Sequence, residues 1–293
     1  MKPAKNQTIT KRPKLFLVDG NSFLYRAFYA IHSLSNSKGE PTNAIYGFIT
    51  MLKKLLAETQ PQYAAICFDR PEPTFRHEKL KTYKANRKPM PEDLVPQIEP
   101  IKQYCRLANL AVFEEPGFEA DDIIGTLAIQ GEKRGWDVFI VTGDKDMLQL
   151  VDENIKILNP HKENWIGDIS KVKERFDGLG PEKVVEVMAI MGDTSDNIPG
   201  VPGIGEKGAL KLVHQFGTIE NLIKHVEKVS SNSQRNLIKE HVELLKTSHE
   251  LAKIDTEVPV KINWDDLEIR EGDDAGLLEF YKRYEFRHFL NIG

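Results

Sequence analysis

Residues 15–21 read Leu-Phe-Leu-Val-Asp-Gly-Asn, a short apolar run that ends in an aspartate. The same pattern recurs at residues 64–69, which end in Asp69, and at residues 138–144, which end in Asp144. Continuous apolar runs of four or five residues that are rich in Val, Ile and Phe are typical of strands buried on both faces of a parallel sheet. The three segments therefore predict three parallel strands, each followed by a carboxylate.

A helix is predicted between the first two of these strands. Thr42 is a suitable N-cap, apolar residues from Ile45 to Leu56 recur at the spacing of one helix face, and Pro61 follows the expected end. Alternation of strand, helix and strand indicates an α/β fold, with a mostly parallel central sheet flanked by helices. Open parallel sheets bind ligands beyond the carboxyl ends of their strands, which is where the three aspartates should meet.

The composition is that of a globular protein: of 293 residues, 40% are apolar and 29% are charged. No apolar run approaches the roughly 18 residues of a membrane-spanning helix, and the polar residues 1–14 do not resemble a secretion signal, so we expect a cytoplasmic protein with no membrane partner. Cys67 and Cys105 are interpreted as reduced, buried thiols. The net charge of −4, taken alone, argues weakly against a nucleic-acid partner.

Shifts in composition divide the chain into parts. A basic tail, residues 1–13, precedes an α/β part, residues 14–180, in which residues 71–100 are rich in proline, lysine and arginine. Proline at this density interrupts regular packing, so we expect an exposed, partly helical excursion with a basic face; a solvated lysine-rich loop is the alternative. Residues 181–293 are expected to be mostly helical, starting at Pro181.

Carboxylates are also concentrated at two further places. Glu119, Asp121 and Asp122 stand directly before an apolar helical segment, while Asp193 and Asp196 are spaced to share one face of a turn. A single acid of this kind is more often a cap or turn residue, but this number of them favours a site. The candidate set is Asp19, Asp69, Glu119, Asp121, Asp122, Asp144, Asp146, Asp193 and Asp196.

Nine neighbouring carboxylates would repel one another strongly, since two unit charges roughly 4 Å apart cost about 4 kcal/mol at an effective dielectric constant of 20. Protonation or bound cations must relieve that repulsion. Oxygen ligands without His or Cys favour Mg²⁺ or Mn²⁺ over zinc, and nine acids exceed what one Mg²⁺ needs. We therefore expect two ions, an arrangement suited to phosphodiester hydrolysis.

A glycine-rich segment, residues 198–208, contains the pattern G-x-G-x-x-G at Gly203, Gly205 and Gly208. A dinucleotide site would need a strand immediately before this pattern, whereas proline turns precede it here, so we reject that interpretation. What remains is a tight turn that opens a helix at residues 206–216, whose free backbone N–H groups would bind phosphate without reading base sequence. A plain turn between packed helices is the alternative.

Together, these motifs resemble those of the 5′ nuclease family of flap endonucleases and 5′-3′ exonucleases, and most closely the branch that forms the N-terminal domain of bacterial DNA polymerase I. The resemblance covers nearly the whole chain. It rests on residues 18–22, 42–48, 68–69, 75–78, 119–122, 143–146 and 191–208. It implies a PIN-like sheet with a basic helical arch at about residues 71–100 and a C-terminal helix-three-turn-helix region that binds DNA.

The resemblance also implies roles for the candidate residues. Asp19, Asp69, Glu119 and Asp121 would be ligands of a first metal, Asp144 and Asp146 would lie close to both metals, and Asp193 and Asp196 would form the second site, with Asp122 behind the ligands. Lys84, Arg87 and Asp144 are expected to act in catalysis. The arch should guide a 5′ single strand through Arg76, Lys79, Tyr83, Lys84 and Arg87, with Tyr83 able to stack on a base. Gly200, Gly203, Gly205 and Lys207 should hold duplex DNA, in a motif that often binds K⁺.

We therefore expect a structure-specific 5′ nuclease that removes 5′ flaps and RNA primers in replication and repair by two-metal-ion catalysis. Its partners would be DNA with a 5′ flap, a nick or a single-stranded 5′ end, and RNA primers on DNA. The resemblance suggests a monomer that is fused to a DNA polymerase or acts with one. Two alternatives are a non-catalytic module that binds branched DNA and a PIN-type single-strand RNA nuclease; the second gives no reason for the basic arch.

Overall fold

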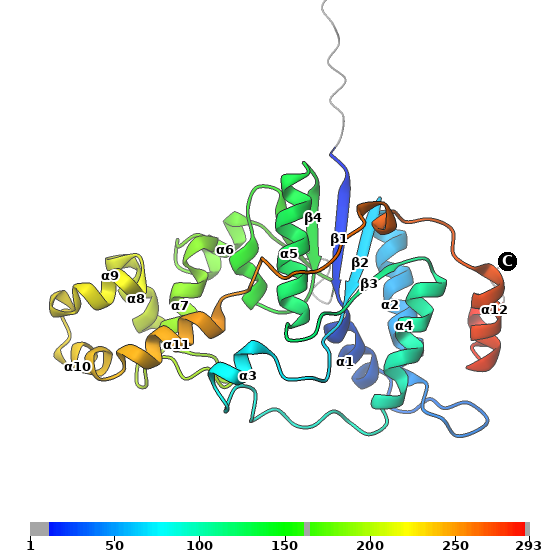
Figure 1. Ribbon diagram of the computed structural model, residues 1–293, viewed down its shortest axis with the longest axis horizontal. Helices are drawn as coiled ribbons and strands as arrows, with labels where there is room; N and C mark the ends of the chain where they lie inside the picture. The colour runs from blue at the N-terminus through cyan, green and yellow to red at the C-terminus, as the bar shows by residue number, and fades with distance from the viewer. Residues whose placement is uncertain (1–11, 161–164, 291–293) are drawn as a thin grey trace, which may run out of the picture.

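A six-stranded sheet forms the centre of the computed structural model, which describes residues 12–160 and 165–290 (Figure 1). The strand order is β3-β2-β1-β4-β5-β6, and among these described strands β6 alone runs antiparallel to its neighbour. Most of the basic tail interpreted at residues 1–13 lies outside the described residues. The strands are β1 Lys14–Asp19, β2 Tyr63–Cys67, β3 Ala111–Phe113, β4 Asp137–Val141, β5 Ile155–Asn159 and β6 Trp165–Gly167.

The three strands predicted from the sequence are confirmed as β1, β2 and β4, and they lie side by side with β1 in the middle. Val18 is in register with Ile66 on one side and with Val141 on the other. Because all three strands run in the same direction, their carboxyl ends reach the same edge of the sheet. The aspartates that follow them are therefore delivered to one place.

Alternate residues of β1 face two separate hydrophobic layers, as the pleat of a strand requires. Leu15 and Leu17 pack with the apolar face of α5, whereas Phe16 and Val18 pack with α1, α2 and α4. The sheet is thus covered on both faces, which explains why its strands read as continuous apolar runs. The covering helices are α1 Gly20–Ala30, α2 Asn43–Thr59, α4 Ile98–Leu107 and α5 Ala120–Lys133.

The first backbone N–H groups of α2 are satisfied by a residue that is distant in sequence and not by the N-cap side chain. Thr42 is the N-cap residue, as predicted, but its side chain makes no capping hydrogen bond. The backbone N–H groups of Ala44 and Ile45 donate instead to Oε1 of the buried Gln97. The helix ends at Thr59, where Gln60 adopts the left-handed conformation before Pro61.

A group of short helices lies to one side of the sheet and ends in α11 (Figure 1, green to orange). The helix predicted at residues 206–216 is confirmed as α8, and the predicted start at Pro181 is a 3₁₀ turn, Pro181–Lys183, that continues into α7. The group comprises α6 Ile169–Arg175, α7 Val184–Met191, α8 Glu206–Phe216, α9 Ile219–Lys224, α10 Asn232–Glu240 and α11 Val242–Ala252. Further 3₁₀ turns are Val95–Gln97, Asp146–Leu150, Val226–Lys228 and Trp264–Leu267.

After α11 the chain returns across the α/β part. Residues 253–273 contain the 3₁₀ turn at residues 264–267 and one bridge, from Glu268 to Tyr63 of β2. The helices α12 Asp274–Arg283 (Figure 1, red) and α13 Arg287–Leu290 then pack on the far side of the sheet. The rings of Phe280 and Phe289 contact Tyr104 of α4 and Tyr46 of α2, respectively. The C-terminal part is therefore mostly helical, as predicted, but its last residues belong spatially to the α/β layer.

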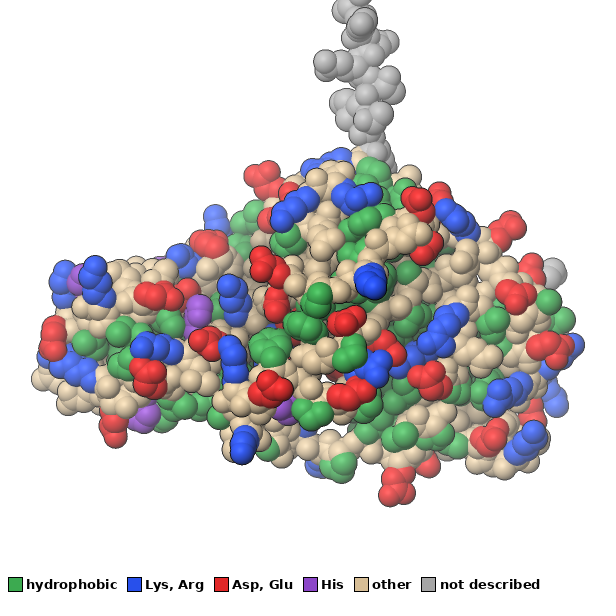
Figure 2. Space-filling model, in the orientation of Figure 1, with side chains coloured by type: hydrophobic (Ala, Val, Ile, Leu, Met, Phe, Trp, Pro, Cys, Tyr) green, Lys and Arg blue, Asp and Glu red, His purple; other side chains and the backbone are tan. Residues whose placement is uncertain are grey.

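The surface carries interspersed charges of both signs on the face shown in Figure 2. Cys67 and Cys105 are free and fully buried, which confirms their interpretation as buried thiols. Among the described residues, none of the helices combines the length and the apolar character needed to cross a membrane.

Candidate active site

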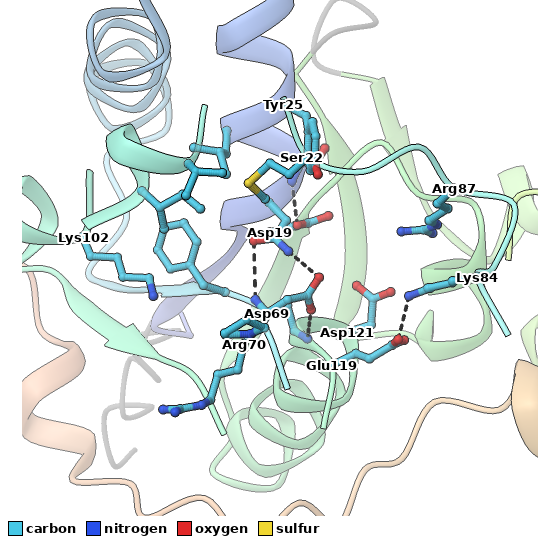
Figure 3. A pocket seen from close by; sticks show the side chains of 18 of the residues that line it. Asp19, Ser22, Tyr25, Asp69, Arg70, Lys84, Arg87, Lys102, Glu119 and Asp121 are labelled. Atoms are coloured by element: carbon cyan, nitrogen blue, oxygen red, sulfur yellow. Dashed lines mark hydrogen bonds and ion pairs between the residues drawn. The ribbon is translucent and has the colours of Figure 1, made fainter. Parts of the chain in front are cut away.

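A pocket of about 870 Å³ opens at the edge of the sheet where the parallel strands end (Figure 3). Five of the nine candidate acids line it: Asp19, Asp69, Glu119, Asp121 and Asp144. Asp19 is the last residue of β1, Asp69 follows β2 and Asp144 follows β4, while Glu119 and Asp121 stand at the start of α5. The convergence expected from the strand pattern is therefore present.

Asp19 is held by the elements on either side of it. Its Oδ1 accepts a hydrogen bond of 2.9 Å from the backbone N–H of Ser22, so that it caps α1, and its Oδ2 accepts one of 2.8 Å from Oγ1 of Thr142. Burial raises the pKa of Asp19 to about 6, and the charges of Asp69 and Asp144 add to this effect although the hydrogen bonds oppose it. The carboxyl group is fixed in position and is poorly stabilised as an anion.

The start of α5 supplies the neighbouring acids. The backbone N–H of Ala120 donates to Asp69 over 2.7 Å, and Asn21 donates to the other oxygen of the same carboxylate. Asp121 projects into the same pocket (Figure 3). Burial, followed by repulsion from Asp144 and Asp19, raises the pKa of Asp121 well above its ordinary value. Its carboxyl group is therefore poorly stabilised as an anion.

Asp144 and Asp146 occupy the turn after β4. The backbone N–H of Asp146 donates to Oδ1 of Asp144 over 2.8 Å, so the turn fixes the Asp144 carboxylate. Burial and then the charges of Asp144 and Asp193 raise the pKa of Asp146 to about 8. Within the described part of the chain, Oδ1 of Asp146 is buried and has no hydrogen-bond partner, which is an uncommon state for a polar atom in a protein interior.

Asp193 and Asp196 lie on a tight loop between α7 and the glycine-rich segment. The backbones of Asp193 and Ile198 exchange two hydrogen bonds of 2.9 and 2.8 Å across this loop. Burial would raise the pKa of Asp193, but hydrogen bonds from Ser195 and the charge of Lys145 outweigh it and hold the pKa below its ordinary value. These two acids are electrostatically close to Asp144 and Asp146, so eight of the nine candidates form one negative region.

The cations of the chain itself reach into this region. Nζ of Lys84 lies 2.7 Å from Oε1 of Glu119 (Figure 3). It also lies 3.7 Å from Oδ2 of Asp196. Arg87 forms an ion pair with Asp196, and Lys145 lies 3.4 Å from Asp193. In residues 12–160 and 165–290, no group of three or more His, Cys, Asp or Glu side chains is arranged as a ready metal site.

The basic segment is only partly exposed, whereas the sequence led us to expect an exposed excursion with a basic face. Its helical part is α3, Phe75–Lys79, as expected for a partly helical excursion. Arg76 and Tyr83, however, are both 3% exposed. The hydroxyl of Tyr83 lies 3.1 Å from both Glu119 and Asp196, and its ring is enclosed, so it is not available to stack on a base in this conformation. Residues 82–87 dock onto the Asp193 loop through the backbone N–H of Lys84 and the side chain of Asn86.

Asp122 faces away from the pocket. Its side chain is fully buried and pairs with Arg76 through two hydrogen bonds of 2.7 and 2.8 Å. It therefore lies behind Glu119 and is not placed to act as a direct ligand in this conformation, although it was included in the candidate set. Lys79 is half-exposed and pairs with Glu250 on α11, outside the acidic pocket.

The glycine-rich segment forms the predicted tight turn. Gly200 and Gly203 have φ angles of +62° and +88°, which side chains with a Cβ rarely adopt. Gly205 is the N-cap position of α8, and a Cβ added there would meet no described atom within 4 Å, so the helix start is open to a ligand. Lys207 is exposed in the first turn of the same helix.

Three residues that organise the site were not among the candidates from the sequence. Asn21 donates to Asp69, Thr142 joins Asp19 to the backbone N–H of Asp144, and Lys145 pairs with Asp193. All three stand within two residues of a candidate acid, so their position next to a strand-end aspartate was the available signal. Tyr25 also lines the pocket from α1.

Comparisons with known proteins agree with this geometry. Residues 14–177 match a family described as 5′-3′ exonuclease, N-terminal resolvase-like domain, and residues 179–275 match 5′-3′ exonuclease, C-terminal SAM fold. The chain is 39% identical over 284 residues to a DNA polymerase I of Bacillus caldotenax, covering 95% of this chain and 32% of that protein. It thus spans about a third of the length of the curated relatives that it matches.

Solved structures show the same fold at lower identity. A T5 protein co-crystallized with metal ions superposes with a TM-score of 0.72 at 21% identity, covering 93% of this chain and 98% of that one. A bacteriophage T5 flap endonuclease in a pseudo-enzyme-product complex with DNA and metal ions superposes with a TM-score of 0.71 at 20% identity, covering 93% of this chain and 99% of that one.

Proposed function

This chain belongs to the 5′-3′ exonuclease family, and we propose that it is a structure-specific 5′ nuclease that hydrolyses DNA phosphodiesters at 5′ flaps and 5′ ends. The observation that carries the proposal is the convergence of strand-end and helix-start carboxylates with Lys84 in one pocket. Removal of flaps and RNA primers in replication and repair is the role that such an activity would serve.

The acid cluster fits divalent metal ions. Oδ1 of Asp146 is buried without a hydrogen-bond partner among the described residues. The raised pKa values of Asp19 and Asp121 show that the described residues do not compensate the negative charge of these carboxylates. Oxygen donors without nitrogen or sulfur favour hard cations, so we propose two Mg²⁺ ions, with Mn²⁺ as a substitute. The first would be held by Asp19, Asp69, Glu119 and Asp121, the second by Asp193 and Asp196, with Asp144 and Asp146 close to both.

Ions held by these residues would supply Lewis-acid chemistry, in which the pKa of an attacking water is lowered and the charge on the leaving oxygen is stabilised. The chain's own contribution is to bind and orient the substrate. Lys84 and Arg87 already lie at the boundary between the two acid groups, where a phosphate that replaces their carboxylate partners would receive the same ammonium and guanidinium donors. Asp19 and Asp69 are fixed by hydrogen bonds from Ser22, Thr142 and Ala120, so their geometry need not change when substrate binds.

Duplex DNA would be held away from the chemistry, by the turn of residues 198–208 and the start of α8. Backbone N–H groups at an open helix start bind phosphate oxygens, and Lys207 adds a charge beside them. We propose that residues 181–293 supply this duplex-binding function and residues 14–180 the catalytic one, with the basic segment of residues 71–100 guiding the 5′ strand. A K⁺ ion at the turn is part of the same proposal.

The partners proposed are DNA with a flap, a nick or a single-stranded 5′ end, and RNA primers on DNA. The matched relatives include DNA polymerase I proteins about three times as long, so we propose a cytoplasmic monomer that is fused to a DNA polymerase or acts with one.

The deciding experiment uses a 5′-labelled flap substrate with Mg²⁺. The protein should release the labelled flap, and both EDTA and Asp144→Asn should abolish release. Tight flap binding without turnover in Mg²⁺ or Mn²⁺ would instead identify a binding module for branched DNA. Preferential cleavage of single-stranded RNA over flap DNA would identify a PIN-type RNA nuclease. Cleavage that survives EDTA would refute the metal-dependent mechanism.

A further inference from the structure

Arg76 is the most completely engaged cation in the described part of the chain. Its guanidinium makes two hydrogen bonds to Asp122, one of 3.0 Å from Nε to the carbonyl of Leu251 and one of 2.8 Å from Nη2 to the carbonyl of Lys253. Nη1 also lies 3.5 Å from Oε2 of Glu119. Hydrogen bonds thus use four of the five N–H donors of the guanidinium, and the fifth is on Nη1, beside Glu119. The side chain is only 3% exposed, so no donor is accessible to a phosphate. Arg76 is therefore not a DNA contact in this conformation.

Its partners join three segments that are distant in sequence. Arg76 itself stands on α3, at the base of the segment that carries Lys84 and Arg87. Asp122 stands in the first turn of α5, and its Oδ2 also accepts from the backbone N–H of Glu119 over 3.1 Å, so it fixes the residue that binds Lys84. Oδ1 of Asp122 accepts in addition from the backbone N–H of Asp255 over 2.8 Å.

The third segment is the end of α11. The last carbonyls of a helix have no partner within the helix and carry partial negative charge, which a buried guanidinium satisfies. One turn earlier on α11, Oγ of the buried Ser248 accepts from the backbone N–H of Gly200, at the start of the glycine-rich turn. Gly200 is thus hydrogen-bonded to α11, and the end of α11 is hydrogen-bonded to Arg76. Arg76 in turn binds Asp122, which binds the backbone of Glu119.

We propose that Arg76 is a positioning residue that links duplex docking at residues 198–208 to the placement of Glu119 and Lys84. The inference rests on the proposed nuclease function and deepens it. The position of α11 depends on the glycine-rich turn, because Ser248 binds the backbone of Gly200. The guanidinium of Arg76 then fixes the end of α11 relative to the start of α5. If Arg76 only filled space in the core, DNA binding at residues 198–208 would not affect the backbone at the start of α5.

The test compares the wild type with Arg76→Lys, because a lysine keeps the charge but has three donors on a single nitrogen and cannot reproduce four hydrogen bonds made from three separate nitrogens. Duplex affinity should be unchanged, while the single-turnover cleavage rate should fall by about 10²-fold, as expected for a small misplacement of catalytic groups. Arg270→Lys is the matched control, since Arg270 also binds one carboxylate, Glu268, through two nitrogens but is exposed and remote from the site.

A second measurement needs no metal and no turnover. In EDTA, duplex DNA should slow amide hydrogen exchange at residues 119–122 of the wild type, and this protection should be absent in Arg76→Lys. If Arg76→Lys does not fold, Arg76→Met/Asp122→Asn replaces it, since that pair leaves no unpaired buried charge. In the double variant the slope of log affinity against log salt should be unchanged, whereas removing a residue that neutralises a phosphate would reduce it by about 0.9.

The outcomes separate the two proposals. Wild-type protein that binds but never cleaves a flap refutes the nuclease function, and the exchange experiment still decides the linkage. Wild-type cleavage rates in Arg76→Lys, DNA-dependent protection that persists in the variant, or a parallel fall in duplex affinity would each overturn the role assigned to Arg76.

Discussion

Nζ of Lys84 lies 2.7 Å from Oε1 of Glu119, so a cation from the basic segment is inserted into the acid cluster. Burial alone would lower the pKa of Lys84, but the charges of Glu119 and Asp196 raise it above its ordinary value, and the ammonium therefore stays charged. This contact places Lys84 where a scissile phosphate would meet the carboxylates.

Lys84→Ala should slow cleavage by about 10² to 10³-fold, the effect of removing one charged donor from a reacting group. Affinity for the duplex portion should change little, because the duplex is proposed to bind at residues 198–208. Single-turnover cleavage and equilibrium binding to flap DNA check this. Lys54→Ala, which removes an exposed lysine on α2, is the control. Equal reductions in rate and duplex affinity would contradict the assignment.

Metal-free protein should become less stable as the pH rises from 5 to 8. The pKa of Asp146 is raised from 3.8 to about 8 in the folded state, so its neutral form stabilises the fold below pH 4 and this contribution is lost as the pH rises toward 8. One pKa unit corresponds to about 1.4 kcal/mol, so urea denaturation in EDTA should show a decrease of at least about 1 kcal/mol in the free energy of unfolding.

Asp146→Asn is the control for that titration. The variant should lose less stability than the wild type over the same pH range and should be the more stable of the two at pH 8 without metal. Mg²⁺ should stabilise the wild type more at pH 8 than at pH 5, since ligand carboxylates must be deprotonated to bind it. An identical pH dependence in both proteins would show that Asp146 does not titrate in this range.

Gly200→Ala should destabilise the protein by about 2 to 4 kcal/mol, because the new side chain combines backbone strain with a clash. A Cβ at this position would lie 2.3 Å from the backbone nitrogen of Gly192, and φ is +62°. Thermal denaturation measures the effect. Gly143→Ala is the matched control, since the one described atom within 4 Å of its added Cβ is Nδ2 of Asn159, at 3.8 Å. Equal melting temperatures for the two variants would contradict the close approach.

Lys207→Ala should weaken binding to all duplex sequences by a similar factor. The side chain is exposed at the start of α8, so it is expected to contact phosphate and not bases. The slope of log affinity against log salt should fall by about 0.9, because the variant neutralises one phosphate fewer. Binding titrations at several salt concentrations check this, with Lys261→Ala as a control. A slope unchanged by the substitution would place the duplex elsewhere.

The sheet and the acid cluster could be predicted because their signals are local. An apolar run ending in aspartate is visible in the sequence at Asp19, Asp69 and Asp144, and parallel strands bring such ends together whatever lies between them. Of the remaining strands, β3 lies within the apolar run of residues 110–113, a signal of the same kind that was missed. β6 has three residues and β5 includes the polar Lys156, so neither of these stands out as a continuous apolar run.

The burial of Arg76 and Tyr83 could not be predicted in the same way. A basic, aromatic and proline-rich segment has the composition of a solvated surface, and what buries these side chains is distant: Asp122 and the end of α11 for Arg76, Glu119 and Asp196 for Tyr83. The return of residues 253–290 to the sheet depends likewise on aromatic contacts that no sequence spacing encodes.

These aromatic contacts determine how far the chain can be shortened from its C-terminal side without exposing apolar surface. A chain ended at residue 275, where the second family match stops, would retain all the proposed site residues. It would lack the rings of Phe280, Tyr281 and Phe289. Their loss would expose the apolar faces of Tyr46 on α2 and Tyr104 on α4. Exposed apolar patches of this kind promote aggregation, so a fragment made for expression should include α13. The aromatic residues that decide this boundary lie on the opposite side of the sheet from α5.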